Sequence, residues 1–315
     1  MRVIRNRPEW ERGKYVSGRS VVTIGNFDGV HRGHQALVER CRALGGPGDA
    51  VAVVTFEPLP LAYFRPDQPP ARLSTVYQKL DVLKRLDVDL TWMLRFDRRF
   101  ASMSARDFVA RVLVEKLRAR CVVVGEDFRF GRGQEGDVEM LRSLGTELGF
   151  DVSTVASVRA EGQRISSSGI RQQLAEGKFA EAERWLGRPF RMEGRVVRGA
   201  ALGRKLGYPT ANLRVRAQPC PLGGVLAVFS RINGGPWLPA VSNLGRRPAV
   251  GGREPLLEVH FFDFDKDIYG QRLDVQFVAK LRDEANFACV EDLVEQMKQD
   301  EVEARARLAV AGRPE

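Results

Sequence analysis

The chain has 315 residues, and at roughly 100–200 residues per domain this length predicts about two domains. Hydrophobic residues make up 43% and charged residues 29% of the sequence, a balance that excludes wholesale disorder and is typical of soluble globular proteins. The net charge of +10 favours anionic partners such as nucleic acid, an acidic membrane surface or small phosphorylated molecules, and composition does not distinguish among these three.

In the first half of the chain, short apolar runs alternate with segments of helical period. We predict strands at 20–25, 51–56, 90–96, 121–125 and 151–158, and helices at 34–44, 76–86, 105–117 and 137–149. Continuous apolar strands separated by amphipathic helices indicate a parallel sheet that is covered on both faces. Residues 1–186 are therefore predicted to form a doubly wound α/β domain.

The second half has a different sequence pattern, with β-rich stretches separated by turn residues. We predict strands at 190–197, 224–232, 237–244, 256–264 and 272–281, followed by one long helix at 289–310. This spacing is typical of an antiparallel barrel or sandwich. We assign residues 187–315 to this second domain.

Several classes of protein are excluded by what the sequence lacks. The four cysteines stand far apart without a CxxC pair, which argues against a structural zinc site and fits a reducing compartment. The first 18 residues have no apolar core of a signal peptide, and no apolar run has the ~18–20 residues needed to span a bilayer. We expect a cytoplasmic protein.

The segment VVTIGNFDGVHRGHQALVERC (21–41) carries the first chemical signal. Gly25 and Gly29 allow a sharp turn between a buried strand and the next helix, and ligands bind at such carboxyl ends of strands. The helix N-terminus there favours phosphate. His31 and His34, three residues apart, would share a helix face and could donate hydrogen bonds to a triphosphate.

The eleven residues GNFDGVHRGHQ resemble the HxGH signature of nucleotidyltransferases, in the form that the sequence of the bacterial FMN adenylyltransferase module has. The resemblance implies that His31 and His34 are catalytic. It also implies that Gly25, Asn26, Phe27 and Gly33 bind ATP.

Two later segments resemble the same family. VGEDFRFGRGQEGD (124–137) is similar to a loop that closes on flavin and nucleotide, which implies flavin contacts for Asp127, Phe128 and Phe130. RISSSGIRQQLAEG (164–177) resembles the motif usually written ISSTxIR. This second match implies that the ATP phosphates are bound by a set of hydroxyl and guanidinium side chains: Arg164, Ser167, Ser168 and Arg171.

The segment GRVVRGAALGRKLGYPTANL (194–213) carries the second signal. Its four glycines, at positions 194, 199, 203 and 207, allow close approach of the backbone, and Arg204 and Lys205 add positive charge. On an extended strand Thr210 and Asn212 would face the same side, where their hard oxygen atoms suit Mg²⁺.

The PTAN tetrapeptide (209–212) resembles the flavokinase signature, and NLGRRPAVGG (243–252) and the stretch 256–284 resemble further parts of that family. The resemblance implies a barrel in which Thr210 and Asn212 bind Mg²⁺ and Glu258 is the catalytic base. It also implies that Gly203 and Lys205 bind the nucleotide. Four positions depart from the common family wording: Leu59, Gln134, Leu226 and Ala249.

Both modules together imply a bifunctional enzyme that uses ATP to convert riboflavin to FMN and FMN to FAD. Its partners would be these small molecules, without nucleic acid or membrane, and the sequence does not give the oligomeric state. Two alternatives stay open: a nucleic-acid-binding protein, suggested by the basic charge, and a chain in which only one module is active.

Overall fold

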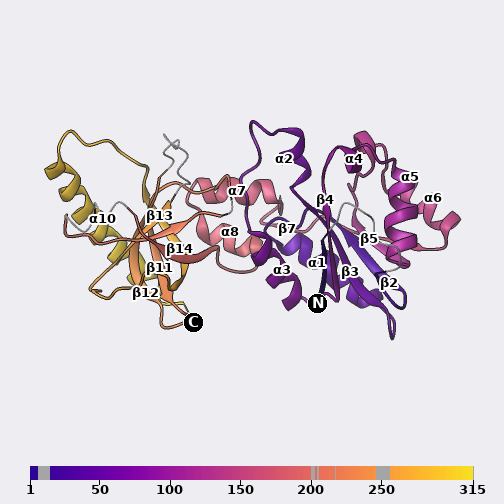
Figure 1. Cartoon of the computed structure of the whole chain (residues 1–315), viewed down its shortest axis with the longest axis horizontal. Helices are drawn as coiled ribbons and strands as arrows, with labels where there is room; N and C mark the ends of the chain where they lie inside the picture. The colour runs from indigo at the N-terminus through magenta and orange to yellow at the C-terminus, as the bar shows by residue number, and fades with distance from the viewer. Residues whose placement is uncertain (6–14, 200–202, 204–205, 217, 246–255, 315) are drawn as a thin grey trace. The chain divides into compact units, whose positions relative to one another are not determined.

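The computed structural model describes residues 1–5, 15–199, 203, 206–216, 218–245 and 256–314 (Figure 1). The chain divides into two compact units. The first comprises Met1–Pro70 and Ser74–Ser167, and the second comprises Ala71–Leu73 and Ser168–Glu315.

The first unit is built on a six-stranded sheet in the order β1-β4-β3-β2-β5-β6, and every neighbouring pair is parallel. The strands are β1 (Arg2–Arg5), β2 (Ser20–Ile24), β3 (Ala50–Glu57), β4 (Leu90–Arg95), β5 (Ala119–Gly125) and β6 (Asp151–Val155). The central strand β2 is buried along its whole length. Strands of this kind must be covered on both sides, and the predicted doubly wound sheet is confirmed.

Helices cover both faces of this sheet. One face packs against α5 (Ala105–Phe108), the π-type turn η1 (Val109–Lys116) and α6 (Val138–Leu148); the other packs against α1 (Arg32–Leu44) and α3 (Val76–Arg85). Successive side chains of β2 point to opposite faces of the sheet, so Val22 and Ile24 belong to the hydrophobic core on the first face and Val21 to the core on the second. The remaining short elements are α2 (Pro60–Phe64), α4 (Arg98–Ala101), η2 (Arg132–Gln134), β7 (Arg159–Ala160) and β8 (Gln163–Arg164).

The second unit contains a closed barrel in the order β10-β13-β12-β11-β14-β9, with antiparallel pairing throughout. Its strands are β9 (Arg191–Val197), β10 (Ala211–Arg214), β11 (Gly224–Ile232), β12 (Leu238–Leu244), β13 (Leu256–Phe261) and β14 (Arg272–Arg282). Leu257 and Val259 are fully buried, whereas Glu258 between them is exposed. The predicted antiparallel barrel is confirmed, and Glu258 faces away from the barrel interior.

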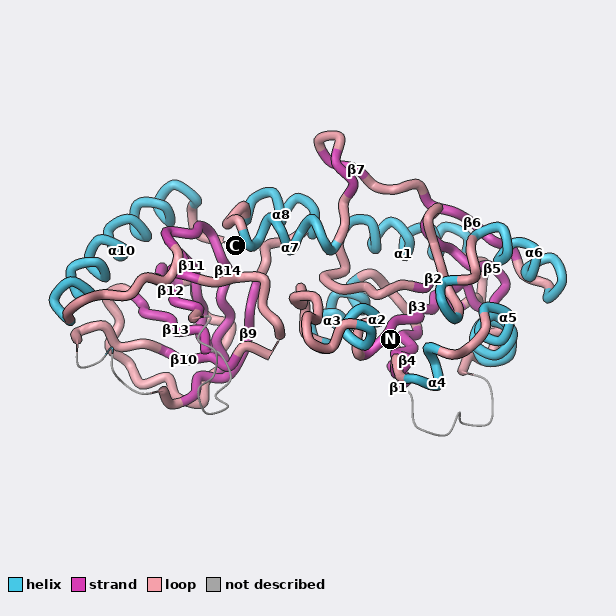
Figure 2. The backbone as a smooth tube through the Cα atoms, turned by 90° about the horizontal axis from the view of Figure 1, so that it is seen from above, coloured by secondary structure: helices cyan, strands magenta, loops and turns pink. Residues whose placement is uncertain are grey.

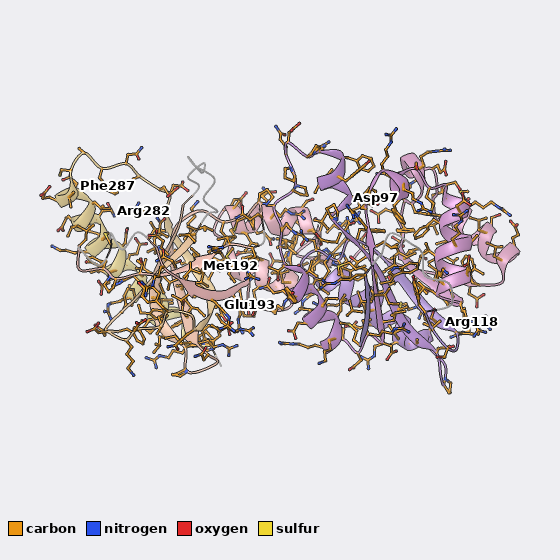
Figure 3. The ribbon with its side chains drawn as sticks, viewed as in Figure 1. Asp97, Arg118, Met192, Glu193, Arg282 and Phe287 are labelled. Carbon is orange, nitrogen blue, oxygen red and sulfur yellow. The ribbon has the colours of Figure 1, made fainter. Side chains whose placement is uncertain are left out.

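Helix α10 (Val290–Ala311) lies along the outside of the barrel strands, as Figure 2 shows. Ala304 and Leu308 pack into a cluster with residues of β11, and Asp300 accepts two hydrogen bonds, of 2.8 and 2.7 Å, from the guanidinium of Arg282. Figure 3 labels Arg282 near Phe287, whose ring lies 5.7 Å from the guanidinium carbon. The ion pair between Arg282 and Asp300 fixes the helix against the end of β14.

Two further helices, α7 (Ser167–Ala175) and α8 (Phe179–Leu186), precede the barrel in the chain. The ring of Phe179 stacks on Phe277 of β14 at a centroid distance of 6.0 Å. Within the described ranges, no helix combines the length and the apolar character that crossing a membrane requires.

Candidate active sites

The first candidate site begins at the turn that follows β2. The Gly25 amide donates to the carbonyl of Val54 on the neighbouring strand at 3.0 Å, which continues the sheet by one residue. Phe27 and Gly29 then take positive φ angles of 48° and 78°, in the left-handed region. The chain therefore reverses within a few residues, and α1 starts at the carboxyl edge of the sheet.

The turn is anchored to the residue that precedes the N-cap of α3. Asp28 is 1% exposed and accepts hydrogen bonds from the amide and the hydroxyl of Ser74, at 3.3 and 3.4 Å. The Ser74 hydroxyl in turn accepts a bond from the Gly29 amide at 3.1 Å. These contacts fix a buried carboxylate and the turn in one arrangement.

The structure brings His31 and His34 together at the N-terminus of α1. Their rings stack at a centroid distance of 3.7 Å and an angle of 18°, and the Phe27 ring lies behind His34 at 4.7 Å. Gly33 leaves space for this pair, because a Cβ there would lie 3.2 Å from the His31 ring. Both imidazoles thus lie beside the amides of the first helical turn, where an anion is favoured.

His34 is held in its neutral form. Burial, and then electrostatic repulsion by His31 and Lys79, hold the pKa of the His34 imidazole well below its ordinary value. Its Nδ1 atom is buried and has no hydrogen-bond partner among the residues that the structure describes. A neutral imidazole can donate one hydrogen bond to a phosphate oxygen without itself carrying charge.

Lys79 is a candidate residue that the sequence analysis missed. Its side chain is fully buried, and the Nζ atom donates to the Asn26 carbonyl at 2.8 Å and to the Thr55 hydroxyl at 3.3 Å. Thr55 also donates to that carbonyl, at 2.9 Å. The signal in the sequence is a lysine four residues before the buried Leu83, on the apolar face of the predicted helix.

Two of the predicted phosphate-binding residues lie in contact with this unit's loops. The Ser167 hydroxyl donates to the Asp28 carbonyl at 3.0 Å, so Ser167 lies at the turn beside His31. Arg164 pairs with Asp127, a predicted flavin contact, at 2.7 Å on the exposed surface.

Ser168 and Arg171 belong to the second unit, where the Arg171 Nε atom donates to the carbonyl of Ala71. Their roles remain predictions.

The two predicted flavin-binding aromatic residues stack on each other at a centroid distance of 5.4 Å. Phe130 is 7% exposed and packs against Phe108 in the core, whereas Phe128 is half-buried. Phe128 is therefore the better placed of the two to meet a planar ligand, with Phe130 as its support.

The second candidate site begins where β10 starts. The Asn212 side chain is 4% exposed, and its amide nitrogen donates to the carbonyl of Thr210 at 3.3 Å. The His260 ring lies 2.9 Å from the carbonyl of Pro209 and 5.0 Å from the Tyr208 ring. These contacts hold the PTAN segment along the outer face of β13.

The strand register places two asparagines on either side of Glu258. Asn212 of β10 is directly opposite Glu258 from one side, and Asn243 of β12 is directly opposite it from the other. Directly opposed residues of antiparallel strands project to the same face. The sequence analysis gave Asn243 no role, although Asn243 is the first residue of the segment NLGRRPAVGG that resembles the family.

Glycines bring the loop before β10 close to the row of residues formed by Asn212, Glu258 and Asn243. A Cβ on Gly199 would lie 2.6 Å from the Asn212 amide nitrogen, and one on Gly203 would lie 2.3 Å from the Tyr208 carbonyl. Gly207 has a φ of 85°, whereas a Cβ on Gly194 would make only ordinary contact. Close approach is thus required at Gly199 and Gly203. Lys205, like Arg204, lies outside the described residues.

The four positions that differ from the common family sequence lie in different surroundings. Leu59 is 4% exposed just before α2, and Leu226 is 1% exposed on β11. Gln134 has a positive φ of 62°, and Ala249 lies outside the described residues.

An α/β unit with paired histidines at a helix N-terminus, joined to a barrel with a Thr-Asn-Glu group, defines a two-module nucleotide-dependent transferase. Residues 14–169 match the family model described as FAD synthetase, and residues 186–308 match that described as riboflavin kinase. The chain belongs to the family of bifunctional riboflavin kinase/FMN adenylyltransferases.

Individual relatives agree with this membership. The bifunctional riboflavin kinase/FMN adenylyltransferase of Escherichia coli K12 is 46% identical over 90% of this chain and 91% of its own length. The Pseudomonas fluorescens protein of the same name is 45% identical over 92% and 93%. A crystal structure from Streptococcus pneumoniae, described as a macrolide-efflux protein, has a TM-score of 0.82 at 32% identity, covering 97% of this chain and 99% of its own.

Proposed function

We propose that this chain makes FAD from riboflavin in two ATP-dependent steps, with the kinase in residues 187–315 and the adenylyltransferase in residues 1–186. The observation that carries the proposal is the presence of both family matches in one chain, each with its own group of polar site residues. ATP donates a phosphoryl group in the first step and an adenylyl group in the second.

In the kinase step, the 5′-hydroxyl oxygen of riboflavin forms a bond to the γ-phosphorus of ATP, and the bond to the β-phosphate oxygen breaks. Glu258 accepts the hydroxyl proton, so FMN and ADP are the products. The outward direction of Glu258 from the barrel supports this role, because an exposed carboxylate is accessible to a bound substrate.

Thr210 and Asn212 are suited to hold the Mg²⁺ that accompanies ATP. Because the Asn212 amide nitrogen bonds to the Thr210 carbonyl, a cation would bind through the carboxamide oxygen of Asn212. Oxygen donors of this kind, next to the carboxylate of Glu258, match the preference of magnesium. The ion would offset the charge of the phosphates.

In the adenylyl step, a phosphate oxygen of FMN forms a bond to the α-phosphorus of a second ATP, and pyrophosphate leaves. The nucleophile is already an anion, so this step needs placement and charge stabilisation and no strong base. His31 and His34 donate hydrogen bonds to the phosphate oxygens at the N-terminus of α1. The stacking of the two rings at that helix terminus and the lowered pKa of His34 support this role.

These substrates also account for the charge of the chain, because every substrate except riboflavin is polyanionic and the net charge is +10. The partners are therefore the flavins and ATP, with no need for nucleic acid or a membrane. The free thiols fit a cytoplasmic location.

The test is chromatography of the flavins after the purified chain is incubated with riboflavin, ATP and Mg²⁺. The wild-type chain should form FMN and then FAD. Glu258→Ala should make no FMN from riboflavin, yet should convert added FMN to FAD. His31→Ala should form FMN from riboflavin at the wild-type rate and accumulate it.

Each variant is the control for the other, because each retains one of the two activities. Loss of both activities in Glu258→Ala would contradict separate sites, and undiminished FAD formation by His31→Ala would remove that residue from the adenylyl site. A wild-type chain that leaves both flavins unchanged would refute the proposed function.

A further inference from the structure

The row across three barrel strands contains one polar residue without an assigned role. Glu258 of β13 has Asn212 opposite it on β10 and Asn243 opposite it on β12. Directly opposed residues place their Cβ atoms about 4.5–5.5 Å apart. Asn243 is therefore a direct cross-strand neighbour of the proposed base, as Asn212 is, on the side away from the magnesium ligands.

The Asn243 side chain is itself incompletely satisfied. Its Oδ1 atom is buried and has no hydrogen-bond partner among the described residues. A buried acceptor without a donor is costly, and such an atom in a native protein indicates a missing partner. Because an amide oxygen only accepts, this partner must be a donor group or a cation, and a phosphate oxygen is excluded.

We propose that the Asn243 carboxamide oxygen binds riboflavin by accepting a hydrogen bond from a secondary hydroxyl of its ribityl chain. The inference rests on the proposed function, in which the single proton of the 5′-hydroxyl passes to Glu258. Asn243 then accepts from a hydroxyl farther along the same chain. The nucleotide and its metal occupy the Asn212 side of Glu258, and the sugar alcohol occupies the Asn243 side.

The test compares two flavins that differ only in the hydroxyls at issue. Riboflavin carries the full ribityl chain, whereas 10-(5-hydroxypentyl)isoalloxazine with the same ring methyl groups retains only the terminal, reacting hydroxyl. The kcat/KM for phosphorylation of each flavin is measured with the full chain at saturating ATP and Mg²⁺, for the wild type and for Asn243→Ala.

The wild-type chain should prefer riboflavin, and Asn243→Ala should reduce that preference about tenfold, the size expected for one lost hydrogen bond. The hydroxypentyl flavin should be phosphorylated at a similar kcat/KM by both proteins, which also shows that the variant folds. Asn243→Asp keeps an acceptor oxygen in the same place and should retain the preference. Asn286→Ala, an exposed asparagine beyond β14, is the matched control.

An equal loss for both flavins in Asn243→Ala overturns the inference, since a structural defect or a metal-binding role would not distinguish them. An increased Mg²⁺ requirement that is the same with both flavins overturns it in favour of a metal ligand. If the wild-type chain phosphorylates neither flavin, the proposed function itself fails. That result is distinct from a wild type that is active and a variant without the change in preference.

Discussion

The packing of Gly199 against Asn212 makes a quantitative prediction for Gly199→Ala. The added methyl carbon would lie 2.6 Å from the amide nitrogen, 2.8 Å from Cγ and 2.9 Å from Oδ1 of Asn212, so it overlaps the whole carboxamide. Ordinary contact between such atoms begins at about 3.5 Å, so one of the two groups must move by about 1 Å. Overpacking of this kind costs about 1–3 kcal/mol of stability.

The larger effect should be on catalysis, because Asn212 lies directly opposite Glu258. Misplacement of a positioned group by about 1 Å can reduce a rate about 100-fold. We therefore expect kcat for FMN formation to fall by about that factor in Gly199→Ala. Conversion of added FMN to FAD should be unchanged.

The assay is the initial rate of FMN formation at saturating riboflavin, ATP and Mg²⁺, together with the melting temperature. Gly194→Ala is the matched control: its new Cβ would come no closer than 3.5 Å to Leu213, so its kinase rate should equal that of the wild type. Equal kinase rates in Gly199→Ala and Gly194→Ala would refute the reasoning that the glycine protects the position of Asn212.

Two further predictions concern the first site. The pKa of His34 is lowered in the folded chain, so on acidification the unfolded chain binds a proton at His34 before the folded chain does. The free energy of unfolding should therefore fall as the pH drops below about 6.5. Urea titrations should show a smaller fall for His34→Gln. Lys79→Met removes one cause of that lowered pKa, so NMR titration should give a higher pKa for His34 than in the wild type. The variant also loses the hydrogen bonds to the Asn26 carbonyl and to Thr55, so FAD formation from FMN should slow about tenfold or more. The exposed Lys84→Met on the same helix is the control, and an unchanged His34 titration in Lys79→Met would contradict the electrostatic argument.

Much of the fold was predictable because its signals are local. Apolar strands and helical periods predicted the parallel sheet, and the β-rich stretches of the second half predicted the antiparallel strands. The helix expected at 105–117 is present, but it continues from α5 into a π-type turn, a change in hydrogen bonding that side-chain periodicity does not reveal.

The candidate sites were predictable only in part, because some of their residues depend on tertiary contacts. Lys79 is indistinguishable by type from the exposed Lys84, and its buried position depends on tertiary contacts with Asn26 and with Thr55 of β3. Asn243 gains its position from the register of β12 against β13, which two separate strand patterns do not specify. The family motifs contain Glu258, Asn212 and Asn243, but not the strand register that places the two asparagines opposite the glutamate.

The period of two along β13 also restricts how the length of the chain can vary. A single residue inserted before Glu258 within the strand would turn the carboxylate into the barrel interior and bring an apolar side chain out to the substrate. Insertions or deletions in this region should therefore be tolerated in the turn at 262–271 and eliminated by selection within Leu256–Phe261.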